Sequence, residues 1–147
     1  MSPVPGDIPR VLSIAGSDSG GGAGIQADLK AIARCGAHGM TAITAITAQN
    51  TVGVNAVEAV SPAMIIAQIE AVASDIGVDA VKVGMLGTTD TIEALIEGLG
   101  IVGDAPVVVD PVMVSETGAS LLDDEARSAL VDGILPLASF VTPNIPE

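Results

Sequence analysis

Short apolar runs rich in valine and isoleucine alternate along the chain with longer segments in which apolar residues recur at helical spacing. The short runs predict strands at residues 11–16, 41–48, 55–60, 80–85, 106–110 and 139–143. The longer segments predict helices at about residues 23–35, 62–76, 88–98 and 123–134. This alternation indicates an α/β fold in which a parallel sheet is covered by helices on both faces.

The alternation breaks once, between Gln49 and Val60, where two short segments follow each other with no helix between them. We predict a small hairpin or flap that leaves the main sheet at this point. Residues 1–10 have no apolar stretch of the signal-peptide kind and are expected to form a flexible tail. Residues 11–147 are expected to belong to a single domain.

A glycine-rich loop joins the first strand to the first helix, in the stretch AGSDSGGGAGIQADL at residues 15–29. A phosphate-binding P-loop needs a Gly-Lys pair, and the chain contains none. Residues 22–27 match the dinucleotide fingerprint G-x-G-x-x-[GA], but no acidic residue lies between Asp28 and Glu58 to hold a ribose. The glycines therefore predict a loop whose backbone approaches some other ligand closely.

Polar or flexible residues follow most of the predicted strands. Because parallel strands end at one edge of a sheet, we expect these residues to meet in a crevice of the kind that binds ligands. They are Asp18, Gln49, Gly84, Met85, Asp110, Val112 and Asn144. Apolar walls with a few polar contacts are typical of small-molecule sites. Taken singly, Asp18 also fits a turn or cap aspartate, and Met85 and Val112 also fit core packing.

Composition narrows the choice of partner. The formal net charge is −13, and Phe140 is the only aromatic residue, so both the charge and the lack of stacking platforms argue against nucleic acid. No apolar stretch is long enough to predict a membrane span. Cys35 is the single cysteine, which excludes an internal disulfide and is consistent with a reducing cytoplasm.

Five motifs occur in a fixed order: AGSDSGGGAGIQADLKA, TAITAQNT, VKVGMLG, DPVM and TPNIPE. Over residues 11–147 they resemble the hydroxymethylpyrimidine (phosphomethylpyrimidine) kinases of thiamine biosynthesis, which belong to the ribokinase-like superfamily. The resemblance implies a three-layer α/β/α fold with a mostly parallel sheet and a small hairpin flap. It also implies ATP-dependent phosphorylation of 4-amino-5-hydroxymethyl-2-methylpyrimidine and then of its monophosphate.

In this family the glycine loop lines the pyrimidine pocket. The resemblance assigns substrate contacts to Gly16, Asp18, Ala23, Gln49, Met85 and Val112. The Gln49 amide offers one donor and one acceptor, which can pair with a ring nitrogen and the adjacent amino group of an aminopyrimidine. Met85 can lie against the flat ring, and the hairpin after Gln49 would shield the substrate.

The resemblance also implies a magnesium site that serves the ATP phosphates. The N-x-x-E pattern of Asn144 and Glu147 would organise the ion, with Glu147 acting through water, and Asp110 would lie near the metal and the phosphates. Carboxylates and waters suit Mg²⁺, which dehydrates reluctantly. On its own, N-x-x-E also fits a loop followed by the start of a helix.

Sequences of this family continue beyond the position of Glu147, with an anion hole and a catalytic base. The chain thus resembles the N-terminal portion of the kinase domain, and we expect no catalytic residue within it and no activity from it alone. The chain has Glu116 in the stretch where the family often has a lysine, and we assign this difference no effect on phosphate binding. The full-length enzyme is expected to be a cytoplasmic homodimer. The alternatives are a pyridoxal-type kinase, a non-catalytic pyrimidine-binding module and, as the weakest, an NAD-dependent dehydrogenase.

Overall fold

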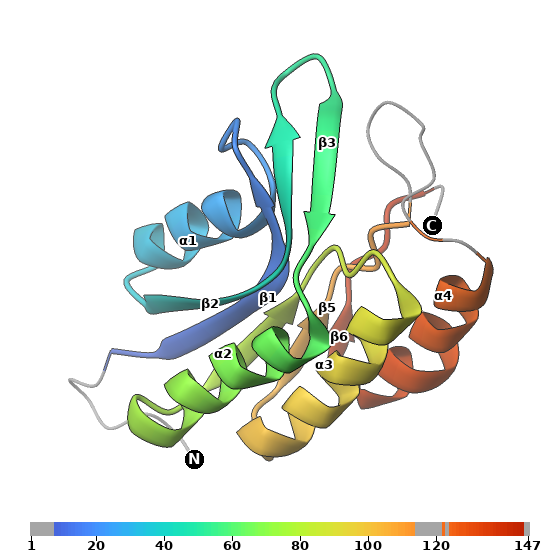
Figure 1. The fold of residues 1–147 in the computed structure, drawn as a ribbon. Coiled ribbons are helices and arrows are strands. Elements are labelled where there is room, and N and C mark those ends of the chain that lie inside the picture. The colour runs from blue at the N-terminus through green and yellow to red at the C-terminus, as the bar shows by residue number, and fades with distance from the viewer. Residues whose placement is uncertain (1–7, 114–121, 123, 146–147) are drawn as a thin grey trace.

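A single six-stranded sheet forms the centre of the molecule, with strand order β3-β2-β1-β4-β5-β6 (Figure 1). The structure is a computed structural model, and it describes residues 8–113, 122 and 124–145. The strands are β1 (Arg10–Asp18), β2 (His38–Gln49), β3 (Val54–Ala59), β4 (Ala80–Val83), β5 (Val107–Val109) and β6 (Phe140–Val141). Every neighbouring pair is parallel except β2 and β3. The predicted mostly parallel sheet is confirmed.

Helices cover both faces of this sheet. They are α1 (Gly24–Arg34), α2 (Pro62–Asp75), α3 (Thr89–Val102) and α4 (Asp124–Ala129). Helix α1 packs against β1 and β2 on one face, whereas α2, α3 and α4 lie together on the other (Figure 1). The three-layer α/β/α arrangement predicted from the sequence is therefore confirmed.

The last predicted helix, at 123–134, differs from the observed structure. Helix α4 passes into a π-helical turn at Leu130–Ile134 and then a 3₁₀ turn at Leu135–Leu137. Pro136 lies inside that final turn, and a proline lacks the N–H group that an α-helix would need there. The three helix types differ in residues per turn, but each of these last two segments is only about one turn long, so the apolar pattern could not separate them.

The hydrophobic core lies between the sheet and the layer of α2, α3 and α4. Leu12 and Ile14 of β1 are fully buried there, in one hydrophobic cluster with Ile65 and Ile69 of α2. The opposite side of β1 is more polar, because the fully buried Ser13 faces α1 and bonds to one of its carboxylates. One face of the sheet thus supplies most of the apolar burial, and the other leaves room for polar side chains.

The predicted hairpin is formed by β2 and β3 themselves. Strand β3 pairs antiparallel with the end of β2, and Asn50 and Gly53 close the turn through a backbone hydrogen bond of 3.0 Å. All six residues of β3 are exposed, and the hairpin extends beyond the rest of the sheet (Figure 1). The two short segments seen in the sequence are therefore a turn and one strand, and β2 supplies the other strand.

Arg10, expected at the end of a flexible tail over 1–10, is the first residue of β1. Its guanidinium donates to the Asp79 carboxylate at 2.6 and 2.8 Å, and its backbone N–H donates to the same group at 2.8 Å. These hydrogen bonds lower the pKa of Asp79 to about 2. Residues 1–7 of the expected tail lie outside the described residues.

Candidate active site

The predicted ligand-binding residues do lie at one edge of the sheet. Asp18 and Gln49 are the last residues of β1 and β2, and Met85 follows β4 closely. Asp110 follows β5, and Asn144 comes shortly after β6. Because these five strands are parallel, their carboxyl ends share one edge, as the sequence predicted.

The glycine loop is organised by Asp18. This carboxylate is only 5% exposed and accepts hydrogen bonds from the backbone N–H groups of Gly20 at 2.7 Å, Gly22 at 2.9 Å and Ala23 at 2.8 Å. Burial raises the pKa of Asp18, but the backbone N–H groups of Ala23, Gly20, Gly22 and Gly21 outweigh it, so the net pKa is lowered. Asp18 therefore has the turn-forming role considered as an alternative; a ligand contact by the same residue stays a prediction.

Helix α1 starts in direct contact with β1. The Gln26 amide accepts from the Asp18 backbone N–H and donates to the Ser17 hydroxyl, both at 2.8 Å. Gly24 has a φ of +57°, and a Cβ atom there would lie 2.3 Å from the Gly16 carbonyl oxygen. Only glycine fits a backbone approach this close. The loop between Asp18 and Gly24 is consequently fixed at both ends.

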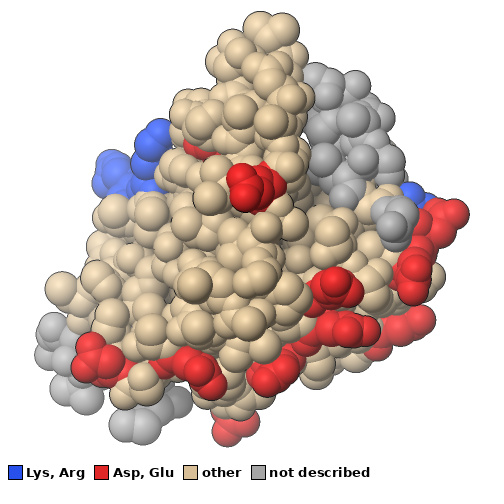
Figure 2. Space-filling view, in the orientation of Figure 1, with Lys and Arg blue, Asp and Glu red and all other residues tan. Residues whose placement is uncertain are grey.

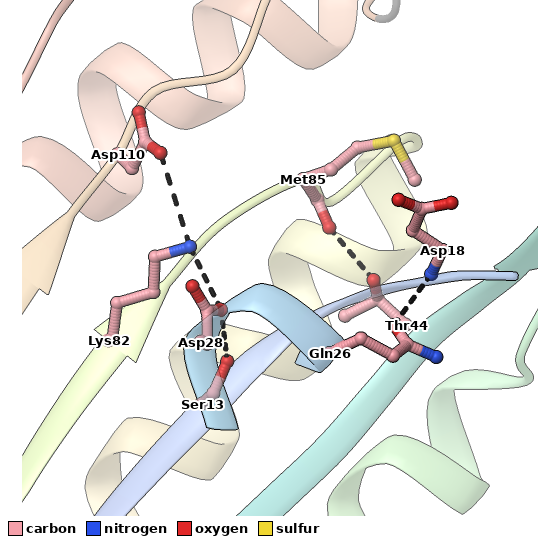
Figure 3. Close-up of polar contacts among 8 residues, drawn as sticks. All are labelled: Ser13, Asp18, Gln26, Asp28, Thr44, Lys82, Met85 and Asp110. Atoms are coloured by element: carbon pink, nitrogen blue, oxygen red, sulfur yellow. Dashed lines mark hydrogen bonds and ion pairs between the residues drawn. The ribbon is translucent and has the colours of Figure 1, made fainter. Parts of the chain in front are cut away.

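Met85 covers Gly16 at the centre of this edge. The fully buried Thr44 donates its hydroxyl to the Met85 carbonyl oxygen at 2.8 Å, which fixes the backbone after β4. A Cβ atom on Gly16 would come within 2.6 Å of the Met85 methyl group, so the methionine occupies the space that the glycine leaves. Its side chain extends toward Asp18 (Figure 3). These contacts bring Gly16, Asp18 and Met85 together.

Gln49 joins the same cluster from β2. The Ser19 hydroxyl donates to the Gln49 carbonyl oxygen at 2.6 Å and accepts from its backbone N–H at 2.8 Å, which ties the loop to the strand. The Gln49 Oε1 atom accepts only a 3.2 Å hydrogen bond from the Thr47 hydroxyl, whose single proton it shares with the Ser17 carbonyl oxygen at 2.8 Å. For Gln49 Nε2 the structure gives no hydrogen bond to any described residue. The amide is half-buried and little engaged.

The two remaining predicted substrate residues lie at the margins of the cluster. Ala23 is exposed and precedes α1, and only its backbone bonds to Asp18. Val112 is half-buried after β5, where its backbone N–H donates to the Asp110 carbonyl oxygen at 2.9 Å. The structure thus places Ala23 against Asp18, at the margin of the cluster, and Val112 beside Asp110.

Asp110 and Asn144 follow neighbouring strands, because Val109 of β5 is in register with Val141 of β6. Carboxylate and amide oxygens are ligands that suit Mg²⁺. Among residues 8–113, 122 and 124–145, no group of three His, Cys, Asp or Glu residues could hold a metal. Whether Asp110 and Asn144 hold a metal therefore stays a prediction. Glu147, the third predicted metal residue, lies outside the described residues.

A polar chain that the sequence analysis missed runs across the α1 side of the sheet. Ser13 donates to Asp28 Oδ2 at 2.6 Å, and Lys82 Nζ lies 3.0 Å from the same oxygen and 4.0 Å from Asp110 Oδ2 (Figure 3). A signal was present in the sequence, since a lysine inside the apolar run AVKV needs a charged partner. The pattern could not say which carboxylate that partner was.

Among the hollows on the described part of the surface are two that differ in position and lining. One, of about 640 Å³, is lined by Ala67, Glu70, Ala71, Ala73, Ser74 and Ile101, and the other, of about 400 Å³, by the hairpin residues Ile46, Thr47, Ala48, Ala56, Val57 and Glu58. Neither contains a predicted substrate residue. Figure 2 shows acidic side chains spread over the lower part of the face formed by α2, α3 and α4. In the described part of the chain, no helix has the length and apolar character to cross a membrane.

The sheet order, the hairpin and the glycine loop define a ribokinase-like α/β protein, and solved structures agree. Phosphomethylpyrimidine kinase from Clostridium difficile 630 has a TM-score of 0.89 and 52% identity, covering 95% of this chain and 60% of its own. Pyridoxal kinase from Staphylococcus aureus in complex with pyridoxal has a TM-score of 0.82 and 37% identity, covering 95% and 52%.

The phosphomethylpyrimidine kinase family model matches residues 18–147, and the chain belongs to this family. Hydroxymethylpyrimidine/phosphomethylpyrimidine kinase of Rhizobium meliloti is 57% identical over 92% of this chain and 51% of its own length. The protein of the same name from Bacillus subtilis is 49% identical over 95% and 52%. The chain therefore spans about half the length of these relatives.

Proposed function

We propose that the complete protein transfers the γ-phosphoryl group of ATP to 4-amino-5-hydroxymethyl-2-methylpyrimidine and then to the resulting monophosphate. The family membership carries this proposal, since relatives at 49–57% identity bear the name hydroxymethylpyrimidine/phosphomethylpyrimidine kinase. The polar and apolar residues that such an acceptor needs also gather at one sheet edge, which supports the same conclusion.

The acceptor pocket is proposed to consist of Gly16, Asp18, Ala23, Gln49, Met85 and Val112. The little-engaged amide of Gln49 supplies a donor and an acceptor for the ring nitrogen and amino group of the pyrimidine. Met85 gives an apolar surface beside the ring. Asp18 holds the glycine loop through three backbone N–H groups, so the pocket wall is formed before the substrate arrives.

Phosphoryl transfer depends mainly on positioning and on stabilising negative charge. We place Mg²⁺ at Asp110 and Asn144, with Glu147 acting through water, and the bound ion would neutralise charge on the phosphate oxygens of ATP. Asp110 and Asn144 orient those oxygens relative to the acceptor edge. The catalytic base and the anion hole are proposed to lie beyond Glu147.

The test is a steady-state assay of ADP release by the complete protein, with the hydroxymethyl pyrimidine, its monophosphate and pyridoxal offered in turn. We expect turnover with both pyrimidines and a higher kcat/KM for the hydroxymethyl pyrimidine than for pyridoxal. Pyridoxal is the second candidate because the Staphylococcus aureus pyridoxal kinase shares the fold, although its 37% identity is below the 52% of the phosphomethylpyrimidine kinase. A preference for pyridoxal would overturn the assignment.

A second measurement on the complete protein distinguishes a kinase from a non-catalytic pyrimidine-binding module. Calorimetry would show pyrimidine binding in both cases, but the module would release no ADP. We also place the enzyme in the cytoplasm as a homodimer. Light scattering of the complete protein tests the dimer.

A further inference from the structure

Three charged side chains from three elements form a line on the α1 side of the sheet (Figure 3). Lys82 of β4 lies between Asp28 of α1 and Asp110 after β5, with its Nζ atom 3.0 Å from one carboxylate and 4.0 Å from the other. The exposed side-chain fraction rises along this line, from 16% for Asp28 to 25% for Lys82 and 33% for Asp110. The line therefore leads from the interior to the carboxylate proposed as a metal ligand.

The position of the ammonium is built into the fold. Ser13 is in register with Lys82 on the neighbouring strand, is fully buried, and donates to the same Asp28 oxygen that Lys82 contacts. Gly84 leaves the necessary space, because a Cβ atom there would lie 2.9 Å from both Lys82 Nζ and the Ala15 methyl group. The Asp28 carboxylate, which Ser13 holds in place, and the space beside Gly84 thus fix the position of the Lys82 ammonium. In this it differs from the ammonium of a mobile surface ion pair.

The charges of this line have a direct consequence for cation binding. Two carboxylates flanking one ammonium leave a single net negative charge, and the ammonium occupies the space between them. A divalent cation approaching Asp110 is therefore repelled by Lys82 at short range. Without Lys82, Asp28 and Asp110 would present two negative charges to the same region.

We propose that Lys82 is a tethered counter-cation that sets the charge of the Asp110 site, so that a divalent metal binds there weakly on its own and tightly only together with the phosphates of a nucleotide. Phosphate oxygens add the negative charge that Lys82 offsets, and metal and nucleotide then bind as one unit. Lys82 is in this sense a positioning residue and touches neither acceptor nor metal. The inference rests on the proposed metal-binding role of Asp110.

The test measures Mn²⁺ binding to the complete protein without nucleotide, by the loss of the free-ion electron paramagnetic resonance signal. Lys82→Met removes the ammonium, and we expect binding about tenfold tighter than in the parent protein, the order given by one unit charge facing a divalent ion in partly exposed surroundings. Asp28→Asn keeps the ammonium and removes one carboxylate, so binding should weaken. The double variant Asp28→Asn/Lys82→Met restores one net negative charge and should return to the parent affinity.

Asp110→Asn added to Lys82→Met should abolish the gain, which places the bound ion at Asp110. Unchanged Mn²⁺ affinity in Lys82→Met would make this line an ordinary structural ion pair and overturn the inference. If circular dichroism shows that Lys82→Met does not fold, unchanged Mn²⁺ affinity in Asp28→Asn would overturn it instead. Kinase activity is read separately with the pyrimidines. If the protein does not phosphorylate the pyrimidines but its variants show the expected changes in Mn²⁺ affinity, only the proposed function is refuted. If it phosphorylates them but the Mn²⁺ affinities do not change as expected, only the role of Lys82 is refuted.

Discussion

Gln49 is the residue whose free hydrogen-bonding capacity most clearly suits a heteroaromatic ligand. Its backbone is fixed by Ser19, yet its side-chain amide receives only one long hydrogen bond, from Thr47. In contrast, the Gln68 amide is fully used, since it accepts from the Ile43 backbone N–H at 2.9 Å and donates to its carbonyl oxygen at 3.1 Å. The two glutamines are therefore a matched pair, one available for a ligand and one structural.

We expect Gln49→Ala in the complete protein to weaken pyrimidine binding about tenfold or more, because a lost hydrogen-bond pair with a buried ligand costs about 1–3 kcal/mol. ATP affinity should stay nearly unchanged. Titration calorimetry with each ligand measures both. Gln68→Ala is the control, and it should lower the melting temperature while leaving pyrimidine affinity intact. Equal pyrimidine affinity in Gln49→Ala and the parent protein would remove Gln49 from the site.

Asp79 predicts a pH dependence of stability. Its pKa of about 2 in the folded protein lies below its ordinary value of 3.8, so the folded state favours the charged carboxylate. The stabilising contribution is therefore complete above pH 3.8 and is lost as the pH falls toward 2. The pair with Arg10 is about two-fifths exposed, so solvent screening limits the contribution to about 1 kcal/mol or less.

Urea unfolding at pH 6 and at pH 3 measures this contribution. The difference in unfolding free energy between the parent protein and Asp79→Asn should be larger at pH 6. Asp104→Asn, a change at an exposed carboxylate in a turn, is the control for the loss of one negative charge elsewhere on the surface. A constant difference between parent and Asp79→Asn at both pH values would contradict the assigned role of the pair with Arg10.

At the scale of elements, the contact between α1 and β1 depends on one missing side chain. Gly24→Ala adds a methyl group 2.3 Å from a backbone carbonyl oxygen at a positive φ, so the helix start has to move. Gly36→Ala is the matched control, with a φ of +78° and no atom within 4 Å of the added Cβ. The control should lose about 1 kcal/mol from the backbone conformation alone. Gly24→Ala should lose about 1–3 kcal/mol more from overpacking.

Chemical denaturation of both variants gives these differences, and the pyrimidine affinity of Gly24→Ala should fall as well because the glycine loop moves with α1. Equal losses of stability in the two variants would show that the loop yields to the extra methyl group without moving the helix.

The strands and helices could be predicted because buried positions in each of them are apolar and recur at the spacing of a strand or a helix. Strands β1 and β2 are longer than predicted, since polar residues such as Asp18 and Gln49 continue the ladder after the apolar run ends. The edge could also be predicted, because parallel strands must end together. The partners of Lys82 could not be assigned, because Asp28 and Asp110 belong to other parts of the chain and only the folded chain fixes their distances from the ammonium.

At the scale of the whole molecule, the β6 edge of the sheet carries exposed apolar side chains. Strand β6 pairs with β5, and its side chains Phe140 and Val141 are 68% and 42% exposed. Exposed apolar side chains on an edge strand promote association. A polypeptide of these 147 residues alone is therefore expected to aggregate or dimerise, and to show no kinase activity because the base and anion hole are proposed to lie beyond it.

Light scattering and an ADP-release assay on this polypeptide test both expectations. Phe140→Lys should reduce its association, because a charge on the edge strand opposes pairing. Val52→Lys changes a residue that is 84% exposed at the hairpin turn, away from β6, and serves as the control that should not. A monomeric polypeptide that phosphorylates the pyrimidine would contradict the proposed location of the catalytic groups.

The strand order β3-β2-β1-β4-β5-β6 also bears on how the protein is made. Once β1, β2 and β3 have formed, β4 joins β1, and each later strand adds beside the one before it. Among the described strands none has to be inserted between two others, so after β3 the sheet can grow from the β1 side alone as the chain leaves the ribosome, N-terminal residues first. Gly16, Asp18, Gln49 and Met85 would then be assembled while Asp110 and Asn144 are still being synthesised. On the proposed assignment, most of the acceptor pocket would form before the metal residues are synthesised, and Val112 would join it together with Asp110.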